Sequence, residues 1–193
     1  EDIQEAGLLG ADYIVTHMGS HKDTSEEQGI ERLTRALNVI LEKTRKIKVG
    51  ILLENTAGSG SWLGYKFSHQ RKIMQGLKHK ERVGLCLDTA HAYLAGQNVA
   101  TKNGLEAFLN DLDKQVGISW LRLVHLNDAR DALGSHHDRH ESIGKGNIGL
   151  EGMRRIVNHP KLRDLPFILE TPKSADDTLD ILNLNTVRRL RKD

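Results

Sequence analysis

Five short apolar segments of this chain are each followed by a side chain that can bind a metal ion: His17, Glu54, Asp88, His125 and Glu170. Buried carboxylates repel one another unless protons or cations neutralise them, so a converging set of carboxylates and imidazoles points to divalent cations. None of the five is a thiol, and a mixture of histidine and carboxylate suits zinc or manganese in a hydrolytic centre. The sequence therefore predicts a metal-dependent hydrolytic site.

Three further candidate ligands lie a little beyond these positions. His91 follows Asp88 by three residues, and Asp138 and His140 form an Asp-x-His pair. Eight ligands exceed what one ion needs, which indicates two or more ions. Metal ions about 3.5–4 Å apart can clamp both the attacking and the leaving oxygen in phosphodiester hydrolysis.

The remaining histidines and the single cysteine are expected to be unrelated to the site. Four histidines are expected in loops or solvent: His21, His69, His79 and His159. His136 and His137 lie beside the Asp-x-His pair and are expected to be bystanders. Cys86 sits within an apolar segment, where it would serve as a small buried hydrophobe. A single cysteine excludes an internal disulfide and suits a reducing compartment.

The elements that must position these side chains alternate between strand and helix. The apolar segments are short and mostly continuous, which is typical of strands buried on both faces of a parallel sheet. They cover residues 13–15, 49–53, 83–87, 121–124 and 167–169. Helical spacing covers residues 30–41, 73–77, 105–116, 153–157 and 174–190, and residues 1–10 read as the tail of a helix. Thr101 is a plausible N-cap and Gly117 a plausible stop for the third of these helices.

This alternation predicts most of a (β/α)₈ TIM barrel, which uses roughly 31 residues per unit when it has about 250 residues. In such a barrel the carboxyl ends of the strands point into one shared site. An open doubly wound sheet is the alternative. No linker or low-complexity tract divides the chain, so residues 1–193 are treated as one domain. The chain begins with Glu1, inside a predicted helix, which leads us to expect a fragment or processed product.

Composition narrows the class of protein. The chain has 193 residues, of which 38% are hydrophobic and 28% charged, an ordinary globular mixture. We find no apolar run of the roughly 20 residues that span a bilayer and no secretion signal, so no membrane association is expected. The net charge of +2 is too small to indicate nucleic-acid binding by itself, and a DNA-binding surface would have to be a local patch.

Several sequence blocks, in order along the chain, resemble the endonuclease IV family of zinc-dependent abasic-site (AP) endonucleases. Those that carry the resemblance are His17-x-Gly-Ser, Glu54-Asn-Thr-Ala-Gly, Asp88-Thr-Ala-His91, the stretch 125–149 and Leu169-Glu170-Thr171. The resemblance implies a TIM barrel of which this chain holds about the last five βα units, with the first three strands absent. It also implies a DNA-repair enzyme that hydrolyses the phosphodiester 5′ to an abasic site, leaves a 3′-hydroxyl, and trims blocked 3′ ends.

The resemblance further implies three zinc ions, with manganese as a possible substitute. The eight candidates would divide as follows: His17 on the first ion, Glu54 bridging the first and second, Asp88, His125 and Glu170 on the second, and His91, Asp138 and His140 on the third. Glu54 or Glu170 would orient or deprotonate the attacking water. The family's second histidine on the first ion has no counterpart here. Position 18 is methionine where proline is common, and Lys145 replaces a frequent acidic residue.

The expected partner is double-stranded DNA with abasic sites, bound by a monomer in the full-length family. Arg130, Arg139 and Lys145 are candidate phosphate contacts, and Trp62 would pack either against a base or sugar or within its own loop. We expect an intracellular protein, nuclear or mitochondrial in a eukaryote and cytoplasmic in a bacterium. Without the first strands, the isolated chain is expected to be unstable, inactive or dependent on a partner fragment. The alternatives are a metal-dependent sugar isomerase of related fold and an inactive DNA-binding remnant.

Overall fold

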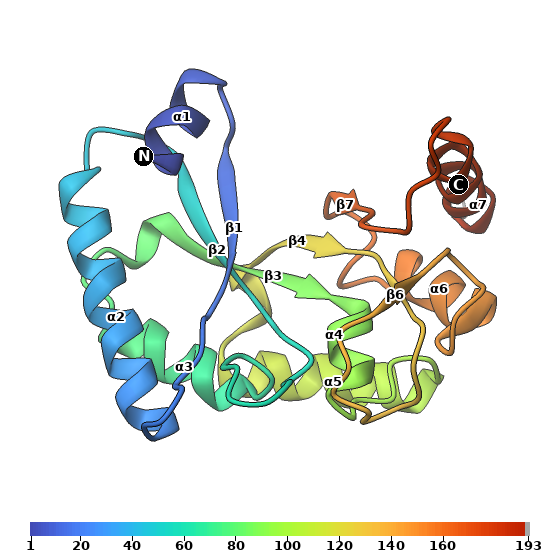
Figure 1. Ribbon diagram of the computed structural model, residues 1–193, viewed down its shortest axis with the longest axis horizontal. Coiled ribbons are helices and arrows are strands. Elements are labelled where there is room, and N and C mark those ends of the chain that lie inside the picture. The colour runs from blue at the N-terminus through green and yellow to red at the C-terminus, as the bar shows by residue number, and fades with distance from the viewer. Residues whose placement is uncertain (192–193) are drawn as a thin grey trace.

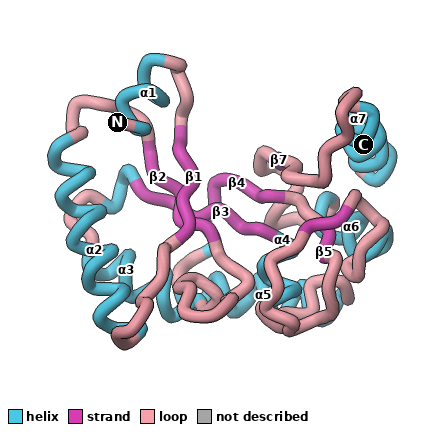
Figure 2. Tube along the Cα trace, viewed as in Figure 1, coloured by secondary structure: helices cyan, strands magenta, loops and turns pink. Residues whose placement is uncertain are grey.

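Five parallel strands form one curved sheet in which spatial order follows chain order. The computed structural model of the chain describes residues 1–191. The strands of this sheet are β1 (Tyr13–His17), β2 (Gly50–Glu54), β3 (Val83–Asp88), β4 (Leu121–His125) and β7 (Phe167–Ile168). A doubly wound sheet would reverse its strand order at a switch point. No reversal occurs in this sheet, so the chain forms an arc of a TIM barrel, as predicted (Figures 1 and 2).

The larger helices follow one another around the sheet. The helices are α1 (Asp2–Leu8), α2 (Glu26–Lys43), α3 (Phe67–Gly76), α4 (Thr89–Leu94), α5 (Lys102–Gln115), α6 (Gly149–Val157) and α7 (Thr178–Leu190). Helix α2 contacts α3, α3 contacts α5, α5 contacts α6, and α6 contacts α7. This succession is what an outer helical ring of a barrel requires. Within residues 1–191, no helix combines the length and apolar character needed to cross a bilayer.

Capping explains where the best-predicted helices begin. Ser25 precedes α2 and accepts a hydrogen bond from the Gln28 N–H, while the Gln28 side chain accepts one from the Ser25 N–H. Thr101 caps α5, as predicted, by accepting from the Gly104 N–H. The last helix was predicted to start near residue 174 but begins at Thr178.

Two short elements were not predicted. Helix α4 has six residues, too few for a helical period to show in the sequence. It begins because Asp88 accepts a hydrogen bond from the His91 N–H. The antiparallel pair β5 (Asp128–Ala129) and β6 (His140–Glu141) brings together residues eleven and thirteen positions apart, which no local pattern indicates.

Burial of the strands differs between the middle and the edges of the sheet. Strands β2 and β3 are buried along their whole length, as predicted. Strands β1 and β7 are partly exposed, so the prediction of burial on both faces is wrong for them, because each is an edge of this sheet. On the face away from the main core, Leu52, Cys86 and Leu123 form a small apolar cluster. Cys86 is therefore buried among apolar side chains, as predicted. Its Sγ also lies within 4.8 Å of a potential ligand atom of Glu54 and of His125, so the expectation that it is unrelated to the site was wrong.

His69 joins α3 to the start of α2, so its assignment to a solvent-facing loop was wrong. Its side chain is only 2% exposed, its Nδ1 accepts from the Gly64 N–H, and its Nε2 lies 3.2 Å from Glu26. Glu26 also accepts hydrogen bonds from the Tyr65 hydroxyl and the Lys66 ammonium group. His159 is likewise buried, beside Glu106. Both histidines are structural residues of the helical layer.

Acid should weaken the fold through Glu26. The Tyr65 hydroxyl, aided by His69 and Lys66 against the effect of burial, lowers the Glu26 pKa from 4.5 to about 2. A carboxyl group with a lowered pKa contributes stability above its unfolded pKa, and that contribution is lost as the pH falls through the folded value. We therefore expect Glu26→Gln to destabilise the chain at pH 7, and the difference from wild type to shrink between about pH 4.5 and 2.

Urea unfolding at a series of pH values measures this difference. Glu31→Gln, which changes an exposed glutamate of the same helix, is the control. A Glu26→Gln variant whose deficit stays constant down to pH 2 would contradict the assignment.

Candidate metal centre

The register of the sheet places the candidate ligands at one edge. His17 is paired with Glu54 across β1 and β2, and Asp88 with His125 across β3 and β4. Glu170 lies just beyond the end of β7, whose Ile168 is paired with His125. The carboxyl ends of all five strands therefore meet, as the barrel prediction required.

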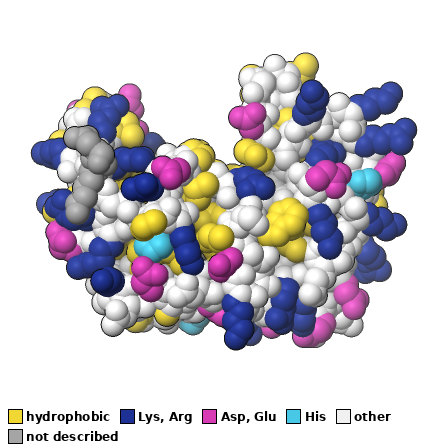
Figure 3. Space-filling view, turned by 180° about the vertical axis from the view of Figure 1, so that it is seen from behind, with side chains coloured by type: hydrophobic (Ala, Val, Ile, Leu, Met, Phe, Trp, Pro, Cys, Tyr) yellow, Lys and Arg dark blue, Asp and Glu magenta, His cyan; other side chains and the backbone are white. Residues whose placement is uncertain are grey.

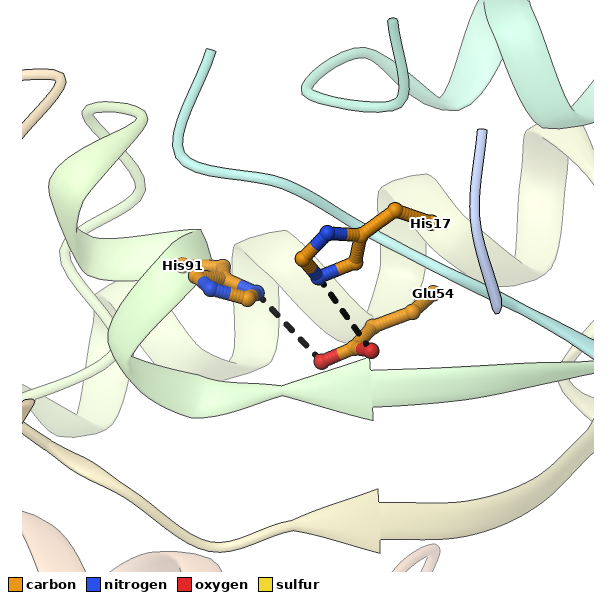
Figure 4. Close-up of side chains that lie close together, drawn as sticks. All are labelled: His17, Glu54 and His91. Carbon is orange, nitrogen blue, oxygen red and sulfur yellow. Dashed lines mark ion pairs between the residues drawn. The ribbon is translucent and has the colours of Figure 1, made fainter. Parts of the chain in front are cut away.

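Glu54 lies at the middle of this cluster and is 5% exposed. Its Oε2 is 3.4 Å from His17 Nε2, and its Oε1 is 2.9 Å from His125 Nδ1 and 3.4 Å from His91 Nδ1. Figure 4 shows His17 and His91 approaching different oxygens of the same carboxylate. With His17 at Oε2 and His125 at Oε1, the two oxygens would be able to hold different ions.

A second group surrounds His125. Its Nδ1 lies 3.0 Å from Glu170 Oε2, and one potential ligand atom from each of Glu54, Asp88, His125 and Glu170 lies within 4.8 Å of the others. Asn127 links two of these carboxylates, because its Nδ2 donates to Asp88 Oδ2 at 2.6 Å and to Glu170 Oε2 at 3.3 Å. The Asn127 Oδ1 accepts from the Glu170 N–H, which fixes the orientation of the amide.

A third group forms around Asp138. His91 Nε2 lies 3.0 Å and His140 Nε2 3.4 Å from Asp138 Oδ1. The short β5–β6 pair carries His140 to this position, and α4 carries His91. All eight predicted ligands thus lie in these three overlapping groups. Their division among three ions stays a prediction.

The hydrogen bonds of the imidazoles fit metal ligands. The His91 Nδ1 lies 2.8 Å from the Asn55 carbonyl oxygen, and the His140 Nδ1 lies 3.0 Å from that of Glu170. An N–H donated to a carbonyl leaves the lone pair on Nε2, and this is the usual arrangement of a metal-binding histidine. Within residues 1–191, the buried His140 Nε2 makes no hydrogen bond, although Asp138 Oδ1 lies 3.4 Å away. The donor set therefore fits divalent cations of the zinc or manganese type.

The charges in the cluster are strongly coupled. Burial opposes ionisation of Glu54, but His125 and His91 lower its pKa to about 2. Burial also opposes the charged form of His91, whereas Asp88, Asp138 and Glu54 raise its pKa to about 11. The carboxylates thus require positive charge nearby. The raised pKa of His91 reflects this need, and a divalent cation would meet it in place of the imidazole protons.

Comparison with known proteins places this site in a family. Residues 1–187 match the family described as "Xylose isomerase-like TIM barrel". The chain is 42% identical to "Probable endonuclease 4" of Halothermothrix orenii and 43% identical to that of Methanoculleus marisnigri. These matches cover 98% of this chain and 68% and 67% of those proteins. The crystal structure of endonuclease IV from Thermus thermophilus superposes with a TM-score of 0.80 at 38% identity, covering 98% of this chain and 65% of that one.

The chain belongs to the endonuclease IV family. It spans about two thirds of the length of the relatives it matches. The resemblance read from the sequence blocks is confirmed.

Two residues of the centre were missed in the sequence. Asn55 brackets the Asp88 backbone: its Nδ2 donates to the Asp88 carbonyl, and its Oδ1 accepts from the Asp88 N–H. Asn127 orients two ligand carboxylates, as described above. Both lie within two residues of a predicted ligand. An amide side chain so close to the end of an apolar segment was the signal that the sequence offered.

The neighbours of the Asp-x-His pair have different environments. His136 Nδ1 lies 2.7 Å from the Ala57 carbonyl, and the Ser59 hydroxyl donates to the His136 carbonyl, so His136 joins the loop carrying Asp138 to the loop after β2. His136 belongs to no metal-binding group among the described residues, and its role is to connect these two loops. His137 is exposed, 3.8 Å from Asp131.

Replacing Asn127 should weaken metal binding without unfolding the chain. Asn127→Ala removes the donor shared by Asp88 and Glu170, so these carboxylates lose their fixed orientation. Loss of such a supporting contact typically lowers metal affinity by about 10–100-fold. Competition of the protein with a zinc chelator measures the affinity. The control is Asn38→Ala, which also removes a side-chain amide but from α2, a helix that carries none of the candidate ligands. Wild-type zinc affinity in Asn127→Ala would refute the role assigned to Asn127.

Proposed function

We propose that this chain carries the catalytic centre of a DNA-repair nuclease that hydrolyses the phosphodiester 5′ to an abasic site and leaves a 3′-hydroxyl. Trimming of blocked 3′ ends is part of the same proposal. The observation that carries it is the convergence of His17, Glu54, His125 and their neighbours at one edge of the sheet. Relatives about 40% identical are described as probable endonuclease 4, which favours this chemistry over sugar isomerisation.

Zinc ions, or manganese in their place, would be held by the eight ligand side chains and would supply Lewis acidity and an activated water. The protein groups then have distinct tasks. Glu54 is buried and central, so it holds the cluster together. The Glu170 side chain is 46% exposed, and a hydrogen bond from His125 lowers its pKa, so its carboxylate is ionised and accessible to the attacking water. Glu170 is therefore the better placed of the two to orient or deprotonate that water.

Contacts to the DNA backbone must come from local side chains. Viewed from behind, Lys and Arg are spread among Asp and Glu rather than gathered in one patch (Figure 3). Arg130 and Lys145 are exposed on the segments that follow β4 and precede α6. Arg139 makes two 2.6 Å hydrogen bonds to Asp131, which occupy one side of its guanidinium group. We propose Arg130 and Lys145 as phosphate contacts. Arg139 would contact a phosphate only through the N–H groups that do not bind Asp131.

The direct test is cleavage of an end-labelled duplex that carries one abasic site. We predict incision on the 5′ side with a 3′-hydroxyl product, abolished by EDTA, and this result would also overturn the expectation from the sequence that the chain alone is inactive. Glu54→Gln should lower the rate on the order of 10³-fold or more, because it removes the bridging charge. His79→Gln, at an exposed histidine before β3, is the control and should cleave at the wild-type rate.

The rival functions give different results in the same preparation. Binding of abasic DNA without EDTA-sensitive cleavage would indicate an inactive DNA-binding remnant. Conversion of a ketose with manganese, and no incision, would indicate an isomerase. Either result would overturn the proposed reaction.

A further inference from the structure

A large aromatic side chain stands exposed beside the metal centre. Trp62 lies in the loop after β2 and is 42% exposed. Its ring meets the His17 imidazole edge-on, with the ring centroids 5.8 Å apart and the planes at 83°. Tryptophan is usually well buried in a protein, so an indole exposed next to a candidate ligand calls for a functional explanation.

Hydrogen bonds between two loops hold Trp62 in place. The loop after β1 and the loop after β2 are joined by the Leu63 N–H to the Gly19 carbonyl at 2.8 Å and by the His21 N–H to the Ser61 carbonyl at 3.0 Å. The hydroxyls of Ser20 and Ser61 are 2.6 Å apart, and Ser20 and Trp62 form an isolated β-bridge. These hydrogen bonds restrain the backbone at Trp62. The loop therefore loses little further conformational freedom when the side chain binds a ligand.

A lysine lies on the loop after β1, beside the serine that contacts the loop of Trp62. Lys22 is exposed, and its N–H donates to the Ser20 hydroxyl that contacts Ser61. Proteins that bind unstacked nucleotides combine aromatic faces for bases with basic side chains for phosphates. Lys22 lies five positions after His17, on the loop that these hydrogen bonds join to the loop of Trp62, so both kinds of side chain are present beside the metal centre.

The second tryptophan has a different environment. Trp120 ends the short 3-10 helix η2 (Ile118–Trp120), which directly precedes β4, and packs against the main apolar core. It therefore lies at the opposite end of the strands from the metal centre. Only Trp62 is placed to meet a substrate.

We propose that Trp62 is a stacking platform for a base or deoxyribose of the DNA strand next to the cleaved phosphodiester, with Lys22 contacting a flanking phosphate. This inference rests on the proposed nuclease function, since it is the phosphodiester that brings the strand past His17. Stacking is insensitive to base identity, so Trp62 should strengthen DNA binding without selecting a sequence.

Intrinsic fluorescence separates the two tryptophans. The probe is a duplex with one stable tetrahydrofuran abasic site and a phosphorothioate at the scissile linkage. In Trp120→Phe, where Trp62 is the only tryptophan, this duplex should quench the emission. In Trp62→Phe, where only Trp120 remains, emission should stay within about 10%.

Binding and turnover of the full chain test the energetic part. By fluorescence anisotropy with a dye-labelled duplex, Trp62→Ala should weaken binding by about tenfold and Trp62→Phe by less, because phenylalanine keeps an aromatic face. The loss should appear in KM, with kcat and bound zinc unchanged.

The results distinguish failure of this inference from failure of the proposed reaction. Wild-type affinity in Trp62→Ala, or no quenching in Trp120→Phe although the protein binds and cuts abasic DNA, would overturn the inference alone. Quenching without any cleavage by the wild type would leave Trp62 as a DNA contact and overturn the nuclease reaction.

Discussion

The carboxylate of Glu54 is almost fully removed from water, and the organisation of the centre follows from that constraint. A buried negative charge is tolerated only where positive charge or hydrogen-bond donors surround it. Imidazoles from β1, β4 and α4 approach Glu54, and each comes from a different segment of the chain. The parallel register is what brings these segments together. Any change that shifted one strand by a residue would turn its ligand side chain to the opposite face of the sheet.

The supporting hydrogen bonds give this cluster its rigidity. Asn55 fixes the backbone of Asp88, and Asn127 ties Asp88 to Glu170 across the sheet. The second tie matters because β7 is only two residues long and contributes little pairing of its own. A metal centre needs ligands held close to their final geometry, and buried amides supply that at positions where strand pairing is weak.

Much of this arrangement was predictable from the sequence, for physical reasons. Ligand-type residues after apolar segments reveal themselves because strand interiors are otherwise apolar, and helix caps such as Thr101 follow from local hydrogen-bonding needs. The eight candidate ligands converge as expected. The burial of His69 was not predictable, because it depends on Glu26, forty-three residues earlier. Exposure of β1 also escaped prediction, since a local pattern does not show which strand lies at the edge of a sheet.

We expect the eight ligand side chains to form one centre for several metal ions. Elemental analysis of the purified, folded chain after equilibration with zinc and removal of excess metal tests it most directly. We predict about two to three zinc ions per chain, lost together on treatment with a chelator. A well-folded chain, judged by circular dichroism, that retains no zinc or a single ion would contradict the claim.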